Sequence, residues 1–231
     1  MQTIDAVWVK LVAKRLERQG LSATELLQRA EVKPYVLNQK SARIPFYQHA
    51  ALLDLAAKAT ENGCFGLDLA ANQGDPRDNG LLVYTALSSK TLGEALKVLK
   101  RYFHVLNEAI DVSVEFSPHE VTINYHLSDA GLAAPRQAIE FGAANFVRTL
   151  RFLTNSLLRP VEVKFRHSRN HENCKVREVL RLSRSFWHAA QFANLLATPA
   201  DPAYCHGGQK AAQDLDRLLR GDLGQPGGQV A

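Results

Sequence analysis

The strongest constraint on the fold is a change of hydrophobic period in the middle of the chain. Apolar and polar residues alternate over residues 112–116 and again over residues 121–127, which is the two-residue period of a half-buried strand. The four residues between the two segments, 117–120, are few enough to join them as a hairpin. One face of such a hairpin is apolar, so other elements must cover it.

Helical periodicity flanks this hairpin on both sides. Apolar residues recur three and four positions apart, which predicts amphipathic helices, in four segments: 7–20, 45–62, 92–106 and 136–158. Ser22 with Glu25, and Thr91 with Glu94, have the spacing of a capping box, which marks the start of a helix. Gly20 is a helix stop, and Pro45 suits a helix start.

The remaining segments complete an α+β prediction. Residues 161–165 alternate as a third strand, residues 172–182 and 209–220 have helical patterns, and residues 32–44 and 72–79 are polar links. We expect a mainly helical single domain with a small antiparallel sheet packed against helices. This domain is predicted to span residues 1–205, followed by a short helix and a disordered tail over residues 206–231.

Composition limits the class of protein. Hydrophobic residues make up 46% of the 231 residues and charged residues 22%, which is typical of a globular protein. No apolar run is long enough for a membrane span or a signal peptide, and the three cysteines are widely separated. We therefore expect no disulfide framework, a reducing cytoplasmic location and no membrane partner. The net charge of +5 comes from a local excess of Lys and Arg over residues 151–186, interpreted as a solvated face.

Motifs for catalysis are missing from the sequence. It has no G-x-S-x-G elbow, no G-x-x-x-x-G-K-[ST] phosphate loop and no G-x-G-x-x-G fingerprint, so an enzyme is not expected. His167, His171 and Cys174 have a spacing that zinc could use, but their polar surroundings favour a solvated loop, and we predict no metal and no cofactor. A haem or gas sensor using His104 is kept as the alternative function.

Aromatic and polar side chains on the apolar stripes could line a ligand pocket between the sheet and the long helices. Such pockets are mostly apolar, with a few convergent polar groups. Packing in the core explains the aromatic residues equally well. The candidate ligand-binding residues are Tyr84, Phe103, Tyr125, Arg136, Phe141 and Phe165.

Several segments over residues 5–180 together resemble a known family. They are Ile44-Pro45-Phe46 with Leu53, Ala56 and Ala57; Phe65-Gly66-Leu67; residues 80–89 and 91–96; Arg101-Tyr102; the two strands; and Pro160-Val161 with Phe165 and His167. The combination resembles the "arabinose-binding" type N-terminal domain of AraC-family transcription regulators. The resemblance implies a bacterial sensor domain that binds a small-molecule effector, a class that includes amino acids and related metabolites. The helix over residues 92–106 could present an apolar ridge to a second copy in a homodimer, but burial in its own core explains the pattern equally well.

The resemblance also has departures. Regulators of this family usually continue into two helix-turn-helix units that bind DNA, and no such pattern follows here, so DNA binding is expected only through a missing domain. Residues 181–188 also fit the family poorly. The sequence therefore favours a ligand-sensing or dimerisation domain of a truncated regulator, with an uncharacterised small-molecule-binding protein as the broader alternative.

Overall fold

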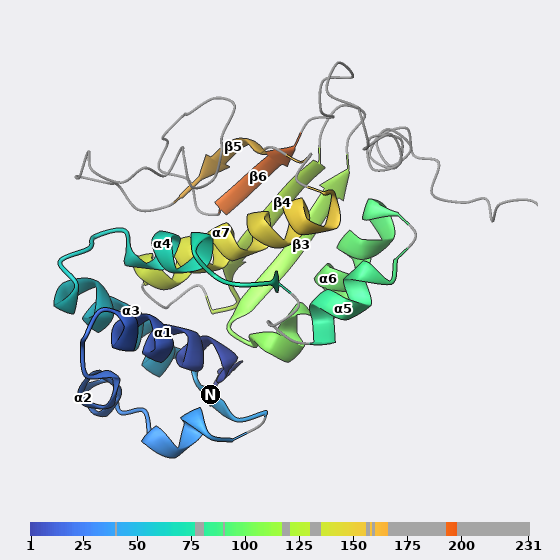
Figure 1. Ribbon diagram of the computed structural model, residues 1–231. Coiled ribbons are helices and arrows are strands. Elements are labelled where there is room, and N and C mark those ends of the chain that lie inside the picture. Colours follow the sequence, from blue (N-terminus) through green and yellow to red (C-terminus); the bar gives the residue numbers. More distant parts are fainter. Residues whose placement is uncertain are drawn as a thin grey trace, which may run out of the picture.

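The computed structural model describes residues 1–39, 41–76, 81–89, 91–116, 121–129, 135–155, 158 and 160–165, together with the backbone of residues 193–197. These residues form helices around two antiparallel sheets (Figure 1), which confirms the predicted α+β class. The helices are α1 (Val7–Arg18), α2 (Ala23–Arg29), the 3-10 helix η1 (Pro34–Leu37), α3 (Phe46–Ala59), α4 (Phe65–Ala71), α5 (Leu81–Leu87), α6 (Leu92–Leu106) and α7 (Arg136–Leu153). The strands are β1 (Thr3–Asp5), β2 (Arg43–Pro45), β3 (Ile110–Phe116), β4 (Val121–Leu127), β5 (Pro160–Lys164) and β6 (Ala193–Ala197).

Both predicted capping boxes start helices. The Ser22 hydroxyl accepts a hydrogen bond from the Glu25 backbone N–H at 3.3 Å, before α2. The Thr91 hydroxyl accepts the equivalent bond from Glu94 at 3.2 Å, before α6. Each bond satisfies one of the backbone donors that a helix start leaves without an intrahelical partner. Gly20 follows α1 with a φ of +75°, a left-handed conformation that glycine adopts without strain.

The larger sheet has the strand order β3-β4-β6-β5. β3 and β4 form the predicted hairpin, with Val112 paired to Tyr125 and Val114 to Ile123. The predicted third strand is β5, but its neighbour is β6 rather than the hairpin. β6 was missed, because its five residues have no polar–apolar alternation that would separate a strand from a buried helix. The smaller sheet pairs β1 with β2.

Three local predictions were wrong. Residues 65–71 form α4, where no helix was predicted. Residues 34–37 and 43–45 form η1 and β2 rather than a polar link, and α7 ends at Leu153 rather than at residue 158. Asn155 has a φ of 49°, which takes the chain out of the helical conformation just after α7. Helices as short as α4 are stable mainly through tertiary packing, which the local sequence does not record.

Helix α7 is the element around which the others pack. It lies across the larger sheet, and α4 runs beside it (Figure 1). Gly66 of α4 makes the closest approach, because a Cβ there would lie 2.3 Å from the Gln137 backbone oxygen. The Gln137 side chain accepts a hydrogen bond from the Gly66 N–H at 2.8 Å and donates one to the Gly63 oxygen at 2.9 Å. Gln137 therefore ties the start of α4 to α7.

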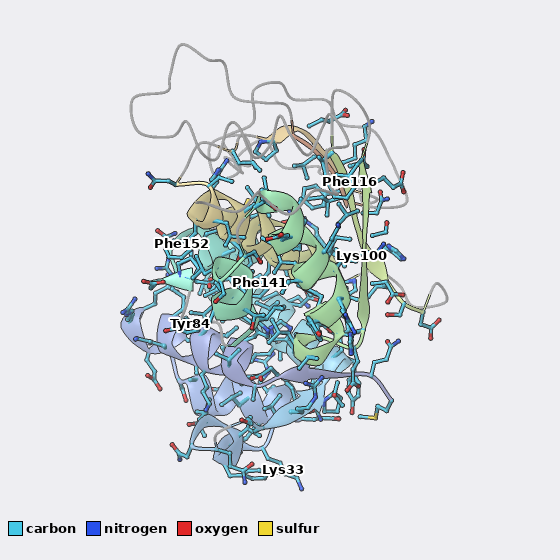
Figure 2. All side chains as sticks on the ribbon, turned by 90° about the vertical axis from the view of Figure 1, so that its right-hand side faces the viewer. Lys33, Tyr84, Lys100, Phe116, Phe141 and Phe152 are labelled. Atoms are coloured by element: carbon cyan, nitrogen blue, oxygen red, sulfur yellow. The ribbon has the colours of Figure 1, made fainter. Side chains whose placement is uncertain are left out.

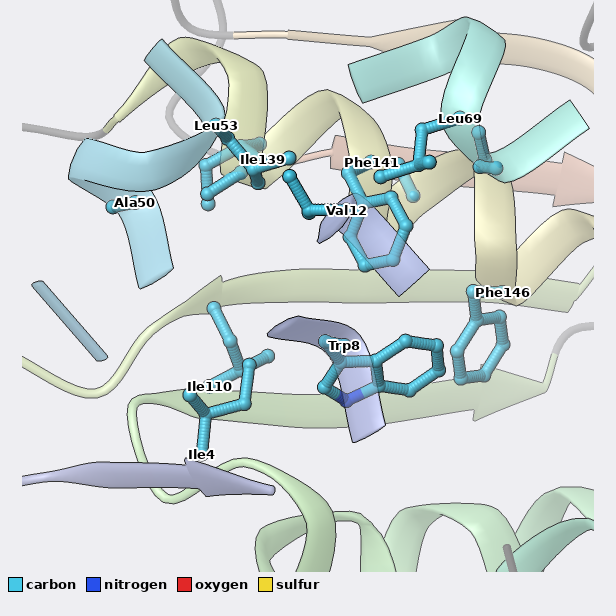
Figure 3. Packing of buried hydrophobic residues seen from close by; sticks show 14 of the residues in the cluster. Ile4, Trp8, Val12, Ala50, Leu53, Leu69, Ile110, Ile139, Phe141 and Phe146 are labelled. Atoms are coloured by element: carbon cyan, nitrogen blue, oxygen red, sulfur yellow. The ribbon is translucent and has the colours of Figure 1, made fainter. Parts of the chain in front are cut away.

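The hydrophobic core is continuous from α1 to the sheet. Trp8 and Val12 of α1 lie beside Phe141 and Ile139 of α7 in Figure 3, with Leu53 of α3 close to Ile139. Phe141 is buried near the centre of the molecule in Figure 2, whereas Tyr84 is exposed on α5. One core therefore joins the N-terminal helices to the hairpin.

Several predictions lie outside the described residues: the helices over residues 172–182 and 209–220, the tail, and the group of His167, His171 and Cys174. The domain boundary at residue 205 stays a prediction for the same reason. Cys64 is disulfide-bonded, which differs from the expectation that disulfides play no part in this chain. The described helices are all too short or too polar to cross a membrane.

The packing of α4 on α7 predicts a stability effect. Gly66→Ala places a methyl group against the Gln137 backbone and should lower the free energy of unfolding by about 1–3 kcal/mol, even though alanine favours a helix by about 1 kcal/mol. Gly63→Ala is the control, because nothing lies within 4 Å of a Cβ there. Urea unfolding of both variants measures the difference. Equal stability of the two variants would contradict the close approach.

Candidate ligand-binding site

A cavity lies between α1, α5, α6, α7 and strand β4, and is called the central cavity below. Its volume is about 40 Å³. Most of the lining side chains are aliphatic or aromatic. The lining residues are Ile4, Trp8, Leu82, Val83, Leu99, Phe103, Leu106, Asn107, Tyr125, Ala138, Phe141, Gly142, Asn145, Phe146 and Thr149. None of these fifteen carries a carboxylate, an ammonium, a guanidinium, an imidazole or a thiol.

The helix period places one stripe of α7 against the cavity. Ala138, Gly142, Asn145 and Thr149 recur at intervals of four, three and four residues, so they share one face of the helix. Their side chains are small or of medium size, and this leaves space between α7 and the aromatic residues opposite. The cavity thus follows from the choice of small residues along one stripe of a buried helix.

Aromatic rings form the remaining wall. Phe103 of α6 meets Tyr125 of β4 edge to face, with ring centroids 5.7 Å apart and an interplanar angle of 81°. Phe103 also packs against Phe146 of α7 at 6.2 Å. On the other side, Trp8 meets Phe141 edge to face, with ring centroids 5.3 Å apart; Figure 3 shows the two side chains next to each other. Edge-to-face pairs of this kind stabilise their own geometry, so the wall has a defined shape.

Tyr125 is the main polar group of the cavity. Its side chain is buried, and a Cβ at Gly142 would lie 2.0 Å from its hydroxyl oxygen, so glycine at this position makes room for the phenol. Burial raises the pKa of Tyr125, which keeps the phenol protonated and able to donate at neutral pH. Among the described residues, no side chain or backbone group forms a hydrogen bond with this hydroxyl. Buried donors normally have a partner.

Asn107 supplies a second donor. Its side-chain oxygen accepts a hydrogen bond from the Ala109 N–H at 3.0 Å, which leaves the amide NH₂ as the end without a partner in the described part of the chain. The residue is 4% exposed and lines the cavity. Its backbone pairs with that of Ile4, which also lines the cavity.

Arg43 holds this side of the cavity in place. Its guanidinium donates to the Thr3 hydroxyl at 2.7 Å, to the Val105 backbone oxygen and to the Glu108 carboxylate at 3.2 Å. The Thr3 backbone N–H donates to the same carboxylate at 3.0 Å, and this bond is the main cause of the lowered pKa of Glu108. These bonds connect β1, β2 and the end of α6, next to Ile4 and Asn107.

Three of the six candidate ligand-binding residues line the cavity. Phe103, Tyr125 and Phe141 meet there, from three different elements. Tyr84 is 53% exposed on α5, while its neighbours Leu82 and Val83 point inward. Phe165 is buried, but away from the cavity lining.

Arg136 contacts other parts of the protein and is not among the lining residues of the cavity. Its Nε donates to the Glu140 carboxylate at 3.1 Å, and its Nη2 donates to the Gly63 oxygen at 3.0 Å. Glu140 is fully buried, and a buried carboxylate needs an opposite charge. The arginine therefore stabilises the first turn of α7 and lies outside the cavity lining.

Several residues of the cavity lining were not predicted. They include the small residues on the inner stripe of α7 and residues that precede β3 in the sequence. Trp8 and Asn107 lie far from α7 in the sequence, so only the fold brings them together. Gly142, Asn145 and Thr149 could have been recognised, because a stripe of glycine and polar residues on a helix that is otherwise buried is unusual.

His49 lies behind the cavity wall. Its ring packs against Phe141 at 5.9 Å and against Phe46 at 6.5 Å, and it is 1% exposed. Neither ring nitrogen has a hydrogen-bond partner in the part of the chain that the structure describes. Burial lowers the pKa of His49 to about 4, because the charged form would lose its hydration. The histidine is thus neutral at pH 7.

His104, the residue of the haem alternative, is exposed on α6 and is not part of the cavity lining. Within the described ranges, no group of three or more His, Cys, Asp or Glu side chains is placed to hold a metal ion.

Comparison with known proteins agrees with the fold. Residues 20–194, more than half of the chain, match the family model described as the arabinose-binding domain of AraC transcription regulator, N-terminal. The chain belongs to this AraC-type family. It is 26% identical over 163 residues to the HTH-type transcriptional regulator VirS of Mycobacterium tuberculosis, in two strains. That match covers 70% of this chain and 48% of VirS, so the AraC-type chain spans about half the length of this relative.

A solved structure has the same fold. The transcriptional regulator CdpR of Pseudomonas aeruginosa matches with a TM-score of 0.50 and 20% identity, over 76% of this chain and 54% of CdpR. At this level of identity the likeness concerns the fold alone. The relatives are transcription regulators, which agrees with the expected family and its role in transcription regulation.

The burial of His49 predicts a pH-dependent stability. The folded-state pKa of about 4 lies below the ordinary value of 6.5, so the neutral form is favoured by folding. The free energy of unfolding therefore has its full value with respect to His49 above pH 6.5. It decreases by roughly 3 kcal/mol as the pH falls toward 4, because the unfolded chain then binds a proton that the folded chain does not. Leucine is similar to histidine in volume but does not titrate. His49→Leu should therefore lose less free energy of unfolding between pH 7 and 4 than the unmodified chain, as measured by urea unfolding at each pH.

His104→Leu is the control for this experiment, because His104 is exposed. Its unfolding free energy should follow that of the unmodified chain at each pH. A His49→Leu variant with the same pH dependence as the unmodified chain would show that His49 does not carry the effect.

Proposed function

We propose that this AraC-type domain is an effector sensor that binds a small molecule in the central cavity. The observation that carries the proposal is a mainly apolar cavity at the junction of five elements, with a buried phenol that has no hydrogen-bond partner among the described residues. Pockets for small molecules have this composition. The family name points to a ligand-binding domain as well.

The size of the cavity suggests how binding is sensed. One buried water needs a cavity volume of roughly 10–15 Å³, so the 40 Å³ of the central cavity hold about three waters. A larger ligand has to displace side chains of α5, α6 or α7. A ligand that prefers the expanded arrangement shifts the population toward it. In a regulator such as the HTH-type relative VirS, that shift would change how another part of the protein binds DNA. This response would take place in the cytoplasm.

Other functions have less support. An enzyme would need a general acid or base at the cavity, and the single titratable side chain in the lining is Tyr125, whose raised pKa makes it a poor base. Haem binding by His104 would take place on an exposed face of α6. Dimerisation stays a prediction: the exposed large apolar side chains of α6 are Tyr102 and Val105, and two side chains make only a small apolar surface.

Blocking the cavity should abolish binding. Gly142→Ala places a methyl group 2.0 Å from the Tyr125 hydroxyl, and Val83→Phe adds a ring from the opposite wall. A ligand found by a thermal-shift screen of amino acids, sugars, small acids and neutral aromatic compounds should raise the melting temperature of the unmodified chain but of neither variant.

Gly63→Ala and Tyr84→Phe serve as controls for this screen, since they change residues outside the cavity lining. Both should keep the ligand-induced shift. Cooperative melting of each variant without ligand shows that it folds. Ligands that stabilise folded Gly142→Ala and Val83→Phe as well as the unmodified chain would contradict the proposal.

A further inference from the structure

The lining of the central cavity limits the class of ligand. Ten of its residues are aliphatic or aromatic, and the four with polar side chains are Asn107, Tyr125, Asn145 and Thr149. An ionised carboxylate or ammonium moved into such surroundings loses its hydration and gains no opposite charge. A sugar would lose the hydration of several hydroxyl groups and find few partners. Both classes are therefore poor occupants.

The polar groups without partners are donors. Tyr125 offers its O–H, because its raised pKa keeps it protonated and no described group accepts from it. Asn107 offers its NH₂, because its oxygen already accepts from Ala109 at 3.0 Å. Thr149 uses its own O–H internally, by donating to the Asn145 backbone oxygen at 3.0 Å. Two donors of the lining, the Tyr125 O–H and the Asn107 NH₂, thus have no acceptor among the described residues.

We infer that the effector is a neutral, mainly apolar molecule with a hydrogen-bond acceptor such as a carbonyl, ester or ether oxygen, which receives the hydrogen bond of Tyr125. This inference rests on the proposed function, and names its ligand class. It differs from the family-based expectation of amino acids, whose two charges have no counterpart in the lining. The apolar part of the molecule would contact the rings of Phe103, Phe141 and Phe146.

Four probes distinguish the classes. Acetophenone has an aromatic ring and a carbonyl acceptor, α-methylstyrene has the same shape without the acceptor, benzoate is the charged analogue, and L-arabinose is the polyhydroxylated one. Binding is measured by the fluorescence of Trp8, which lines the cavity, in a Trp187→Phe background that leaves one tryptophan. Saturation-transfer NMR with the unmodified chain confirms each dissociation constant.

The expected result concerns both ligand and variant. Acetophenone and α-methylstyrene should bind, whereas benzoate and L-arabinose should not. Tyr125→Phe should weaken acetophenone about 2- to 10-fold, which is the range of one hydrogen bond, and should leave α-methylstyrene within about twofold. The phenylalanine variant keeps the ring that packs on Phe103. The control Tyr102→Phe, on the exposed face of α6, should change neither.

Three results would overturn the inference. They are binding of benzoate or L-arabinose that Gly142→Ala abolishes, an acetophenone affinity that Tyr125→Phe leaves unchanged, and failure of acetophenone to bind at all. The proposed function is tested separately by the screen with Gly142→Ala and Val83→Phe. If that screen yields a cavity-dependent ligand of another class, the sensor function stands and this ligand class is wrong.

Discussion

The burial of α7 is the constraint on which the rest of the structure depends. Most of its residues are buried, including Gln137 and Glu140, whose polar groups need partners inside the protein. Gln137 bonds to the start of α4, and Arg136 pairs with Glu140. The opposite face meets Tyr125 of the sheet through Gly142. A helix buried on both faces connects the N-terminal helices with the hairpin, so neither half has a separate core.

The same burial determines how the cavity would respond to a ligand. Protein interiors pack closely, so a ligand larger than a few water molecules cannot enter without moving its neighbours. The walls are held by defined contacts: the aromatic pair of Phe103 and Tyr125, and the hydrogen bonds of Arg43 beside Ile4 and Asn107. Movement of α6 relative to α7 would therefore repack specific pairs, and such repacking is what a two-state response requires.

Local sequence patterns predicted the parts of the fold that depend on local chemistry. The capping boxes at Ser22 and Thr91 start helices as expected, and the alternation in β3 and β4 forms the hairpin. Patterns failed where tertiary contacts decide the structure: α4 is short and depends on Gln137 of α7.

The candidate site could be predicted in part for the same reason. Phe103, Tyr125 and Phe141 were recognised as aromatic residues on apolar stripes, and all three line the cavity. Arg136 lies outside the lining, where it pairs with the buried Glu140 of the same helix, and its ligand contact stays a prediction. Trp8 and Asn107 could not be found, since their place in the wall depends on how the chain returns from α1 to α6. Composition alone also gave no hint that the cavity lacks charge.

The most direct test of the account is to locate a bound neutral ligand by intermolecular nuclear Overhauser effects. With methyl-labelled protein and acetophenone, we expect contacts to the methyl groups of Val83 on α5 and Leu99 on α6, which line the cavity. Leu87 and Val105 lie on the same two helices but are exposed, and should show none. Contacts to Leu87 or Val105 without any to Val83 or Leu99 would place the ligand on the surface and contradict the account.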